Sequence, residues 1–353
     1  MKALILAGGT GSRLRPITHS IAKQLIPVAN KPVIEFGIEA ILETGISDFG
    51  IIVGDARSEI ESHLGDGSKW GASFTYIPQS APLGLAHAVK TARPYLRDEK
   101  FIMYLGDNLI KGGVKELVDD FRKGQCDASI LLTKAPNPEQ FGVAELQGDR
   151  VVRLEEKPKN PKSDLALVGV YLFTPIVFDA IETLQPSFRG EYEITDAIQT
   201  LINWNKRVRY EIVTGWWKDT GTVQAMLEAN RLILQTMSHK QSGTITNSRI
   251  QGEVSIGTGS HLINSVVIGP AIIGQNCKIE NCTIGPFAAV GSECRITGIE
   301  ASDSIVMNGC ELRGHGLHLT SSLLGRNVSL QAEGAPKRTM NLVLGDNSSL
   351  TVS

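Results

Sequence analysis

The chain has 353 residues, of which 42% are apolar and 20% are charged, and its formal net charge is −2. This length allows two or three domains with a sizeable core. The nearly balanced charge argues against a nucleic-acid or anionic-membrane partner. No apolar stretch approaches the roughly 18 residues of a membrane span, and the N-terminus lacks the pattern of a signal peptide. We therefore expect a cytoplasmic protein.

Cysteine usage agrees with that compartment. The spacings of the five cysteines contain no CxxC pair, which argues against a zinc site. We expect small buried thiols in a reducing environment. The cysteines are Cys126, Cys277, Cys282, Cys294 and Cys310.

The part of the chain before residue 240 alternates β-rich runs with helical patterns. Alternation of this kind predicts an α/β domain with a mixed, mostly parallel, Rossmann-like sheet covered on both faces. The predicted strands are 2–7, 49–54, 73–78, 101–107, 127–134 and 166–173. The predicted helices are 31–45, 83–96, 112–124 and a longer one at 221–239.

The later part of the chain has a different period. Aliphatic residues recur near every sixth position, and glycine follows four of them, in IGTGSH, IGQNCK, IGPFAA and VGSECR. This hexapeptide pattern is typical of a parallel β-helix, in which each aliphatic side chain points into the coil. We expect domains at 1–240 and 241–353, roughly three regular turns of about 18 residues each, and a last coil plus a cap after residue 310.

A glycine-rich loop follows the first predicted strand, in LAGGTGSRLRPITHSIAKQLIPV at 6–28. A dinucleotide fingerprint needs a third glycine where this chain has Leu14, and no GxxxxGK[ST] run is present for a P-loop. Arg13 and Arg15 stand directly behind the loop, Lys23 follows, and Pro16 interrupts the helix that would begin there. Backbone N–H groups and cations in this arrangement predict a polyphosphate site away from a helix dipole.

The residues GGTGSRLRPIT and KQLIPVANKPVI resemble the signature of sugar-1-phosphate nucleotidyltransferases. The resemblance runs motif by motif to about residue 235, and the hexapeptide part is similar to the long form with a C-terminal left-handed β-helix. It implies a catalytic domain followed by that β-helix. It also implies direct attack of a sugar-1-phosphate oxygen on the α-phosphorus of a nucleoside triphosphate, in which positioning and charge neutralisation do most of the work.

Within the family, the motifs are most similar to members that use dTTP and glucose-1-phosphate and release dTDP-glucose and pyrophosphate. The resemblance implies Mg²⁺, with Asp107 of YLGDN and Asp219 of WWKDTGT as its ligands. Asp107 follows an apolar strand, where ligands bind in open α/β sheets. From the residues alone, each aspartate has an alternative role as a turn or helix-cap residue.

The resemblance also assigns residues to the nucleotide and to catalysis. Gln79 would pair with the pyrimidine edge, and the Gly84 backbone would support the base. His87 is a departure, because thymidylyl-transferring members more often have glutamine there. The implied catalytic residues are Arg13, Lys23 and Lys157. The implied nucleotide-binding residues are Leu6, Gly8, Gly9, Gly11, Ser12, Arg13, Gln24, Gln79, Pro82, Gly84 and Asp107.

For the sugar phosphate, the resemblance points to several later segments. Lys157 of EEKP would bind the phosphate and Glu156 would accept from sugar hydroxyls, although such a run alone is more often a solvated loop. The segment Leu167-Val168-Gly169 departs from members that have threonine there. The implied sugar-phosphate residues are Asn108, Gly142, Glu156, Lys157, Val168, Tyr171, Arg189 and Trp217.

Three alternatives remain open at this stage. The enzyme could use UTP or another sugar phosphate. The β-helix could add acyl transfer, for which His261, His315 and His318 are available. A regulator without activity is disfavoured by the intact Asp107 and Asp219. Because β-helices expose faces that self-associate, we expect a homo-oligomer.

Overall fold

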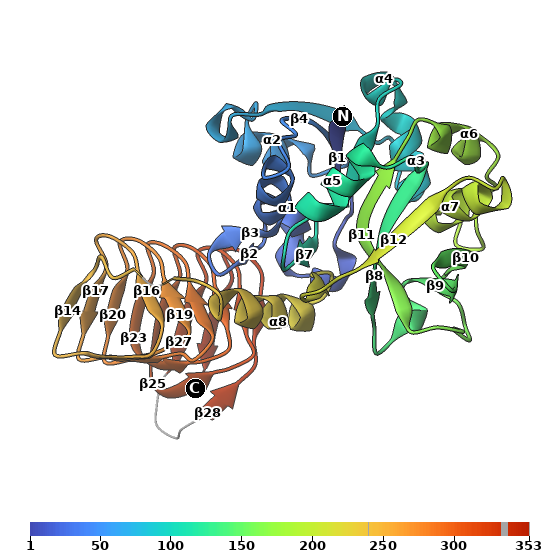
Figure 1. The fold of residues 1–353 in the computed structure, drawn as a ribbon. Coiled ribbons are helices and arrows are strands. Elements are labelled where there is room, and N and C mark those ends of the chain that lie inside the picture. The colour runs from blue at the N-terminus through green and yellow to red at the C-terminus, as the bar shows by residue number, and fades with distance from the viewer. Residues whose placement is uncertain (239, 333–337, 353) are drawn as a thin grey trace. The chain divides into compact units, whose positions relative to one another are not determined.

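A computed structural model of the chain describes residues 1–238, 240–332 and 338–352. The chain divides into two compact units (Figure 1). The first consists of Met1–Thr10 and Ile34–Asp219, and the second of Gly11–Val33 and Thr220–Ser353. Most of the glycine-loop motif therefore belongs to the unit that contains the repeats.

The first unit is built on a nine-stranded sheet. Its main path runs β10-β9-β11-β6-β1-β4-β5, and β8 joins β11 to β12. The β1 strand pairs in parallel with β4 and β6, whereas β11 is antiparallel to β6, so the sheet is mixed. The strands are β1 Lys2–Ala7, β4 Asp48–Val53, β5 Ser73–Pro78, β6 Phe101–Leu105, β8 Ala128–Lys134, β9 Gly142–Gln147, β10 Arg150–Glu156, β11 Leu165–Phe173 and β12 Val208–Ile212.

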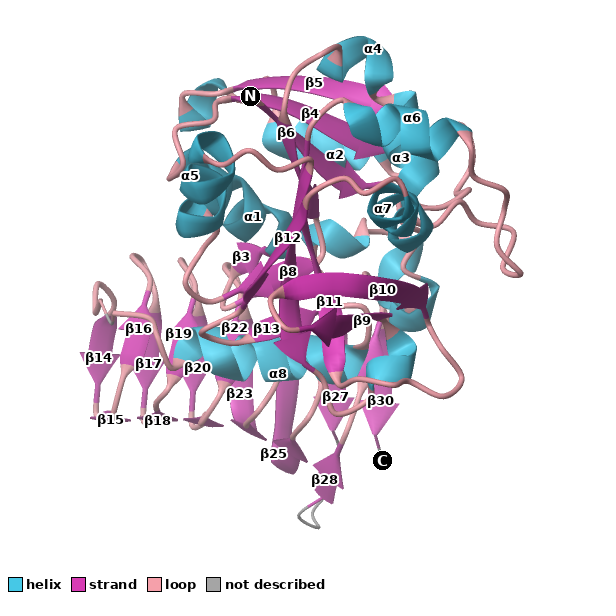
Figure 2. Cartoon of the chain, turned by 45° about the vertical axis from the view of Figure 1, so that its right-hand side comes forward, coloured by secondary structure: helices cyan, strands magenta, loops and turns pink. Residues whose placement is uncertain are grey.

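Helices flank this sheet on both sides, as Figure 2 shows. One core cluster joins strand residues such as Leu4 and Met103 to Val89 of α3, Phe178 of α6 and Ile198 of α7. Burial of such side chains is the main term that holds the layers together. The helices of this unit are α1 Val33–Leu42, α2 Arg57–Leu64, α3 Leu85–Thr91, α4 Arg93–Leu96, α5 Lys115–Lys123, α6 Ile176–Glu182 and α7 Ile194–Asn203.

Two predicted helices differ from the observed ones. The pattern at 83–96 forms two helices, α3 and α4, because Pro94 has no N–H to continue the ladder and is tolerated only in the first turn of α4. The helix predicted at 221–239 is α8 Val223–Leu234. Thr222 caps it, since its Oγ1 accepts from the Ala225 N–H at 3.2 Å. His239 lies outside the described residues.

The second unit contains the predicted parallel β-helix, which confirms the α/β-plus-β-helix fold class. Its strands pair in parallel with the same strand of the next coil, as in the column Ile245, Leu262, Ile279 and Ile296. The strands form an eleven-stranded and a six-stranded sheet. They are β14 Thr244–Thr246, β15 Arg249–Gln251, β16 Val254–Ile256, β17 His261–Ile263, β18 Val266–Ile268, β19 Ala271–Ile273, β20 Lys278–Glu280, β21 Thr283–Ile284, β22 Ala288–Val290, β23 Arg295–Ala301, β24 Ile305–Val306, β25 Glu311–Leu319, β26 Leu323–Leu324, β27 Ser329–Ala332, β28 Arg338–Met340, β29 Val343–Leu344 and β30 Ser349–Val352.

The β-helix is longer than the three turns predicted. Its six-stranded face runs from β16 to β29. Corner residues in the first coils bond to partners 17 residues away, but the later corners bond to partners 18 and then 20 residues away. The lengthened coils break the six-residue period in the sequence while the parallel pairing continues.

Buried thiols and hydroxyls connect successive coils at one corner. Ser260 Oγ donates to the Gly274 carbonyl at 2.7 Å, Cys277 Sγ to Gly291 at 3.0 Å and Cys310 Sγ to Gly325 at 3.1 Å. All five cysteines are free and buried, as expected for small buried thiols. Each S–H or O–H thus donates to a carbonyl of the following coil and links the two coils.

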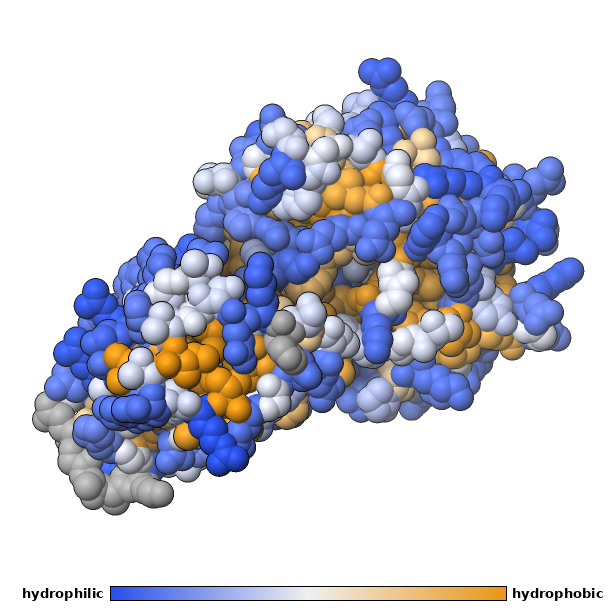
Figure 3. Space-filling model, turned by 60° about the vertical axis from the view of Figure 1, so that its left-hand side comes forward, coloured by the Kyte–Doolittle hydropathy of each residue, from blue (hydrophilic) through white to orange (hydrophobic). Residues whose placement is uncertain are grey.

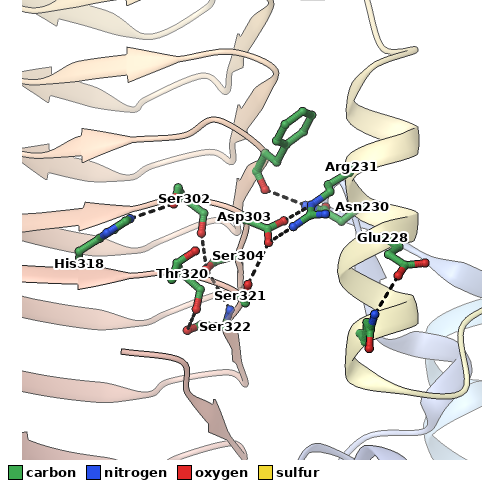
Figure 4. Close-up of polar contacts among 12 residues, drawn as sticks. Glu228, Asn230, Arg231, Ser302, Asp303, Ser304, His318, Thr320, Ser321 and Ser322 are labelled. Atoms are coloured by element: carbon green, nitrogen blue, oxygen red, sulfur yellow. Dashed lines mark hydrogen bonds and ion pairs between the residues drawn. The ribbon is translucent and has the colours of Figure 1, made fainter. Parts of the chain in front are cut away.

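Polar contacts hold α8 and the N-terminal stretch of this unit to the β-helix. Asn230 of α8 donates to the Phe287 carbonyl at 3.1 Å and accepts from the Ala29 N–H at 2.8 Å. Arg231 forms a bidentate ion pair with Asp303, as Figure 4 shows. The Asn30 amide, next to the turn between β2 Pro27–Val28 and β3 Lys31–Pro32, donates to Val290 O at 2.7 Å.

The surface is mainly polar. Figure 3 shows hydrophilic side chains over much of the visible face, with apolar side chains reaching it in smaller areas. Within the described ranges, no helix is long and apolar enough to cross a membrane. The exposed large apolar side chains are Leu83, Val152, Phe188, Trp204, Ile212 and Ile245.

Ile279→Ala should destabilise the β-helix strongly. Ile279 is fully buried in the middle of its column, so truncation leaves a cavity and costs about 2–5 kcal/mol. Ile245→Ala is the matched control, because Ile245 occupies the same column in the end coil and is 38% exposed. Urea unfolding of both variants measures the difference, and equal losses would contradict the predicted packing.

Candidate active site

The start of the glycine loop lies at the end of β1, where the chain passes close to neighbouring strands. A Cβ on Gly8 would lie 3.2 Å from Gln79 Oε1, and a Cβ on Gly54 would lie 2.8 Å from the Gly8 carbonyl oxygen. Glycine is therefore needed at position 54, and a side chain at Gly8 would force the Gln79 side chain to shift. Gly9 is exposed, and Leu6 is buried in β1 with 7% exposure.

Gln79 directly follows β5, and its amide has defined partners. Its Nε2 is 2.9 Å from His87 Nδ1 and donates to the Gly84 carbonyl at 3.4 Å. The His87 ring stacks on Tyr192, with ring centroids 6.5 Å apart. The predicted base-binding residues Gln79 and Gly84 are thus brought together, and His87 joins them.

The loop after Gln79 is fixed by its contacts with Tyr192. The Tyr192 N–H donates to Leu83 O at 2.7 Å, and Tyr192 O accepts from the Ala86 N–H at 3.0 Å. Gly84 has a φ of +103°, and a Cβ there would lie 2.4 Å from Tyr192 O, so only glycine fits. Pro82 is exposed in this loop.

Two short strands bring the predicted metal ligands together. Asp107 directly precedes β7 Asn108–Ile110, and Asp219 ends β13 Trp217–Asp219. These strands pair antiparallel with Asp219 opposite Asn108, so Asp107 comes one residue beyond the end of the ladder, next to the residue that faces Asp219. Asn108 is 2% exposed; its Nδ2 donates to Asp107 Oδ1 at 3.0 Å, and its Oδ1 accepts from Trp217 Nε1.

This pair of carboxylates suits a hard divalent cation. No group of three or more histidine, cysteine, aspartate or glutamate residues that could hold a metal occurs among the described residues. Mg²⁺ does not need such a group, because it is usually bound by one or two carboxylates together with substrate phosphates and water. Asp107 and Asp219 therefore fit Mg²⁺ better than a structural zinc site.

A second cluster forms where β9 and β10 meet. Glu156, at the end of β10, lies opposite Gly142, at the start of β9. A Cβ on Gly142 would lie 2.8 Å from Leu167 Cδ1 and 3.0 Å from Glu156 Oε2. Thr195 Oγ1 donates to Glu156 Oε2 at 2.6 Å, which fixes the orientation of this carboxylate.

Arg189 lies among three carboxylates. It is 2.7 Å from Glu191, 3.4 Å from Glu156 and 3.7 Å from Glu193. Burial raises the pKa of Glu193, and the negative charge of Glu156 adds to that shift, while a hydrogen bond from Ser187 opposes it. The predicted residues Glu156 and Arg189 are therefore in direct contact.

Lys157 and Trp217 lie at opposite ends of one short chain of contacts. Lys157 is exposed with a φ of +45°, and its N–H donates to Phe141 O at 3.0 Å. The Phe141 ring packs edge-on against Trp217, with centroids 5.0 Å apart. In contrast, Val168 and Tyr171 lie in the core of β11, at 0% and 4% exposure.

The remaining predicted residues belong to the second unit. Gly11 has a φ of +65° at the start of the 3₁₀ turn Ser12–Leu14, and its carbonyl accepts from Thr18 Oγ1 at 2.8 Å. Ser12 and Arg13 are exposed. Lys23 and Gln24 begin another 3₁₀ turn, Lys23–Leu25. Gln24 is 1% exposed, and its Oε1 is the one buried side-chain N or O atom in the described ranges without a hydrogen-bond partner.

The contacts that Thr195 and His87 make were not predicted from the sequence. Thr195 reaches Glu156 across 39 residues of sequence, and His87 reaches Gln79 across 8. Neither pair has a local motif. The departure at His87 from the family's usual glutamine was the one available signal.

The chain is similar to known proteins over its whole length. The family model for nucleotidyl transferase matches residues 2–236. A glucose-1-phosphate thymidylyltransferase of Streptomyces griseus is 48% identical, with 100% of both chains covered. One of Streptomyces antibioticus is 50% identical over 100% of this chain and 99% of its own. A Bacillus anthracis structure with sucrose, assigned to the same activity, has 37% identity and a TM-score of 0.64, covering 68% of this chain and 98% of its own.

Asp196→Asn should become more stable relative to the wild type as the pH increases. Burial raises the pKa of Asp196, and the charge of Glu193 adds to it. The neutral acid is thus favoured in the folded state, and its stabilising effect is complete below about pH 4 and is lost as the pH rises through the folded pKa. In urea unfolding, the variant should gain on the wild type between about pH 4 and pH 7.

The control is Asp179→Asn on α6, where the side chain is exposed. The Asp179→Asn variant shows how much of the pH dependence comes from removing an exposed carboxylate from a helix. If the difference between Asp196→Asn and the wild type changes with pH no more than it does for Asp179→Asn, the Asp196 carboxylate is not disfavoured by burial.

Proposed function

The chain belongs to the nucleotidyl transferase family, and we propose that it transfers a thymidylyl group from dTTP to glucose-1-phosphate. The products would be dTDP-glucose and pyrophosphate. The observation that carries the proposal is the position of Gly8, Gln79 and Asp107, which directly follow or nearly follow the carboxyl ends of β1, β5 and β6. Ligands bind at this edge in open α/β sheets. The two full-length Streptomyces relatives support the choice of substrates.

The reaction needs positioning more than covalent chemistry. A phosphate oxygen of the sugar phosphate attacks the α-phosphorus in line while pyrophosphate leaves, so no enzyme nucleophile is required. Asp107 and Asp219 would hold Mg²⁺, which supplies positive charge to the phosphates when bound. The Asn108 amide keeps Asp107 oriented toward that task through its hydrogen bond.

In this proposal, the triphosphate is bound by the glycine-loop motif. Gly8, Gly9 and Gly11 allow the backbone to approach phosphate oxygens, and Ser12, Arg13 and Lys23 supply donors and positive charge. The unpartnered Oε1 of buried Gln24 supports a role in binding, because an orphaned buried acceptor is costly unless a ligand donates to it.

The sugar phosphate is assigned to the cluster around Glu156. Glu156 would accept from sugar hydroxyls, Gly142 leaves room for the ring, and exposed Lys157 would bind the phosphate together with Arg189. Asn108 and Trp217 would also line the sugar-phosphate site. Since Val168 and Tyr171 are buried, we assign them to the wall behind the sugar.

Three further assignments accompany this function. We assign catalysis to residues 1–240 and support of the fold to 241–353. We also propose a homo-oligomer. The first coil presents unpaired strand edges, which favour association, and Ile245 on this coil is exposed. The free buried thiols support a cytoplasmic location.

The decisive test is pyrophosphate release by the full chain with Mg²⁺. We expect the highest kcat/KM with dTTP and glucose-1-phosphate among dTTP, UTP, CTP and GTP, each paired with several sugar-1-phosphates. Asp107→Asn should lower kcat by at least about 100-fold while the circular dichroism spectrum stays unchanged. Activity with UTP and none with dTTP would refute the proposed substrate.

Thr195→Val should weaken sugar-phosphate binding selectively. The variant loses the 2.6 Å hydrogen bond that orients Glu156, so the KM for glucose-1-phosphate should rise about 5- to 10-fold. The kcat at saturating sugar should change little. Steady-state kinetics at fixed dTTP measures both constants.

Thr200→Val is the matched control on the same helix. Its hydroxyl donates to the Asp196 carbonyl and not to Glu156, so its KM should remain that of the wild type. If both variants raise the KM equally, the effect comes from α7 stability and not from Glu156.

A further inference from the structure

The Gln79 amide is held in one orientation by two acceptors. The Gly84 carbonyl can only accept a hydrogen bond, so the Gln79 atom 3.4 Å from it must be the Nε2 donor. The same Nε2 lies 2.9 Å from His87 Nδ1. Both N–H bonds of the amide are therefore directed at protein acceptors, and Nε2 has no hydrogen left for a ligand.

His87 can take this role only in one protonation state. Nδ1 must accept, which requires a neutral imidazole with its proton on Nε2. Burial lowers the pKa of His87, and the nearby positive charge of Lys90 on the same helix lowers it further, so the neutral ring is favoured at neutral pH. Stacking on Tyr192 keeps the ring plane in place.

The atom left for a ligand is Gln79 Oε1, which is purely an acceptor. It lies beside Gly8, 3.2 Å from the position of a Cβ there, at the end of β1. Thymine and uracil have a ring N3–H that can donate to such an oxygen, whereas cytosine has an acceptor at N3. Two acceptors facing each other would leave both without a partner, which penalises the wrong base.

We propose that His87 is a positioning residue for base selection: by accepting from Gln79 Nε2, it fixes Oε1 as the group offered to the base and favours pyrimidines with an N3–H over cytosine. The inference rests on the proposed role of Gln79 in binding the base. It adds a residue that does not touch the nucleotide itself and acts through the Gln79 amide.

A matched pair of variants separates hydrogen bonding from packing. In the His87→Asn variant, the asparagine Oδ1 can accept a hydrogen bond in place of Nδ1. In the His87→Leu variant, the leucine side chain has nearly the same size and branching as asparagine but has no acceptor. The affinities of dTTP, UTP and CTP for the full chain with Mg²⁺ are measured by calorimetry. The same nucleotides are then compared by kcat/KM with glucose-1-phosphate.

We expect the wild type to bind dTTP and UTP more tightly than CTP. His87→Leu should lower the dTTP-to-CTP affinity ratio about tenfold, the size expected for one lost hydrogen-bond orientation. His87→Asn should keep the ratio within about threefold of the wild type. A role in packing alone would change all three affinities together and leave their ratio unchanged.

Two results would overturn the proposal. One is an unchanged base ratio in His87→Leu, and the other is an equal loss in His87→Asn and His87→Leu. Wild-type chain without a preference for dTTP and UTP over CTP would overturn it as well. Base-selective binding without turnover of glucose-1-phosphate would instead uphold this inference and refute the proposed reaction, so the two failures are distinguishable.

Discussion

Parallel pairing of β1 with its neighbours is the constraint on which the proposed site of the first unit depends. The register sets Ala7 beside Val53, Val53 beside Pro78 and Leu6 beside Leu105. The residues that follow these strands must therefore emerge at one edge of the sheet. Gly8, Gly54 and Gln79 are next in the chain, and their close approaches follow directly from that register. The site is thus assembled by backbone pairing, and side chains then refine it.

The features that could be predicted from sequence are those with a local period or motif. The strand at 2–7 is an apolar run that ends where the glycine loop begins. The hexapeptide period identifies buried residues of the β-helix, such as Ile279, directly. Contacts between distant segments carry no such signal. Thr195 on α7 meets Glu156 on β10 only because the helix packs on that strand, and Pro94 divides a helix that periodicity alone would continue.

The extent of the β-helix illustrates the same limit. Its later coils keep buried aliphatic columns, as at Leu312 and Leu330, but the spacing between coils changes from 17 residues to 16, 18 and then 20. A strict period detects only coils of constant length. Parallel pairing tolerates the added residues, because they are placed at corners and bulges and not within the ladders, as at the register shift after Thr297.

Within the second unit, the β-helix is bonded to the stretch that carries the cations of the glycine-loop motif. Asn30 donates to Val290, and Arg326 donates to the Ser20 carbonyl at 2.9 Å, across 260 and 306 residues of sequence. Such long-range bonds restrain a segment made of short 3₁₀ turns, which has little regular structure of its own. The repeats therefore stabilise the backbone between Gly11 and Val33 and are more than an independent appendage.

The same short turns explain why the motif is rich in positive charge. Leu14, where a dinucleotide fold would have its third glycine, is fully buried, and a 3₁₀ turn of three residues follows Gly11 in place of an α-helix. A turn of this length sums too few peptide dipoles to attract a phosphate as an α-helix N-terminus does. In the proposed site, charge neutralisation must then come from side chains, and the exposed guanidinium of Arg13 and the ammonium of Lys23 are placed on this stretch to provide it.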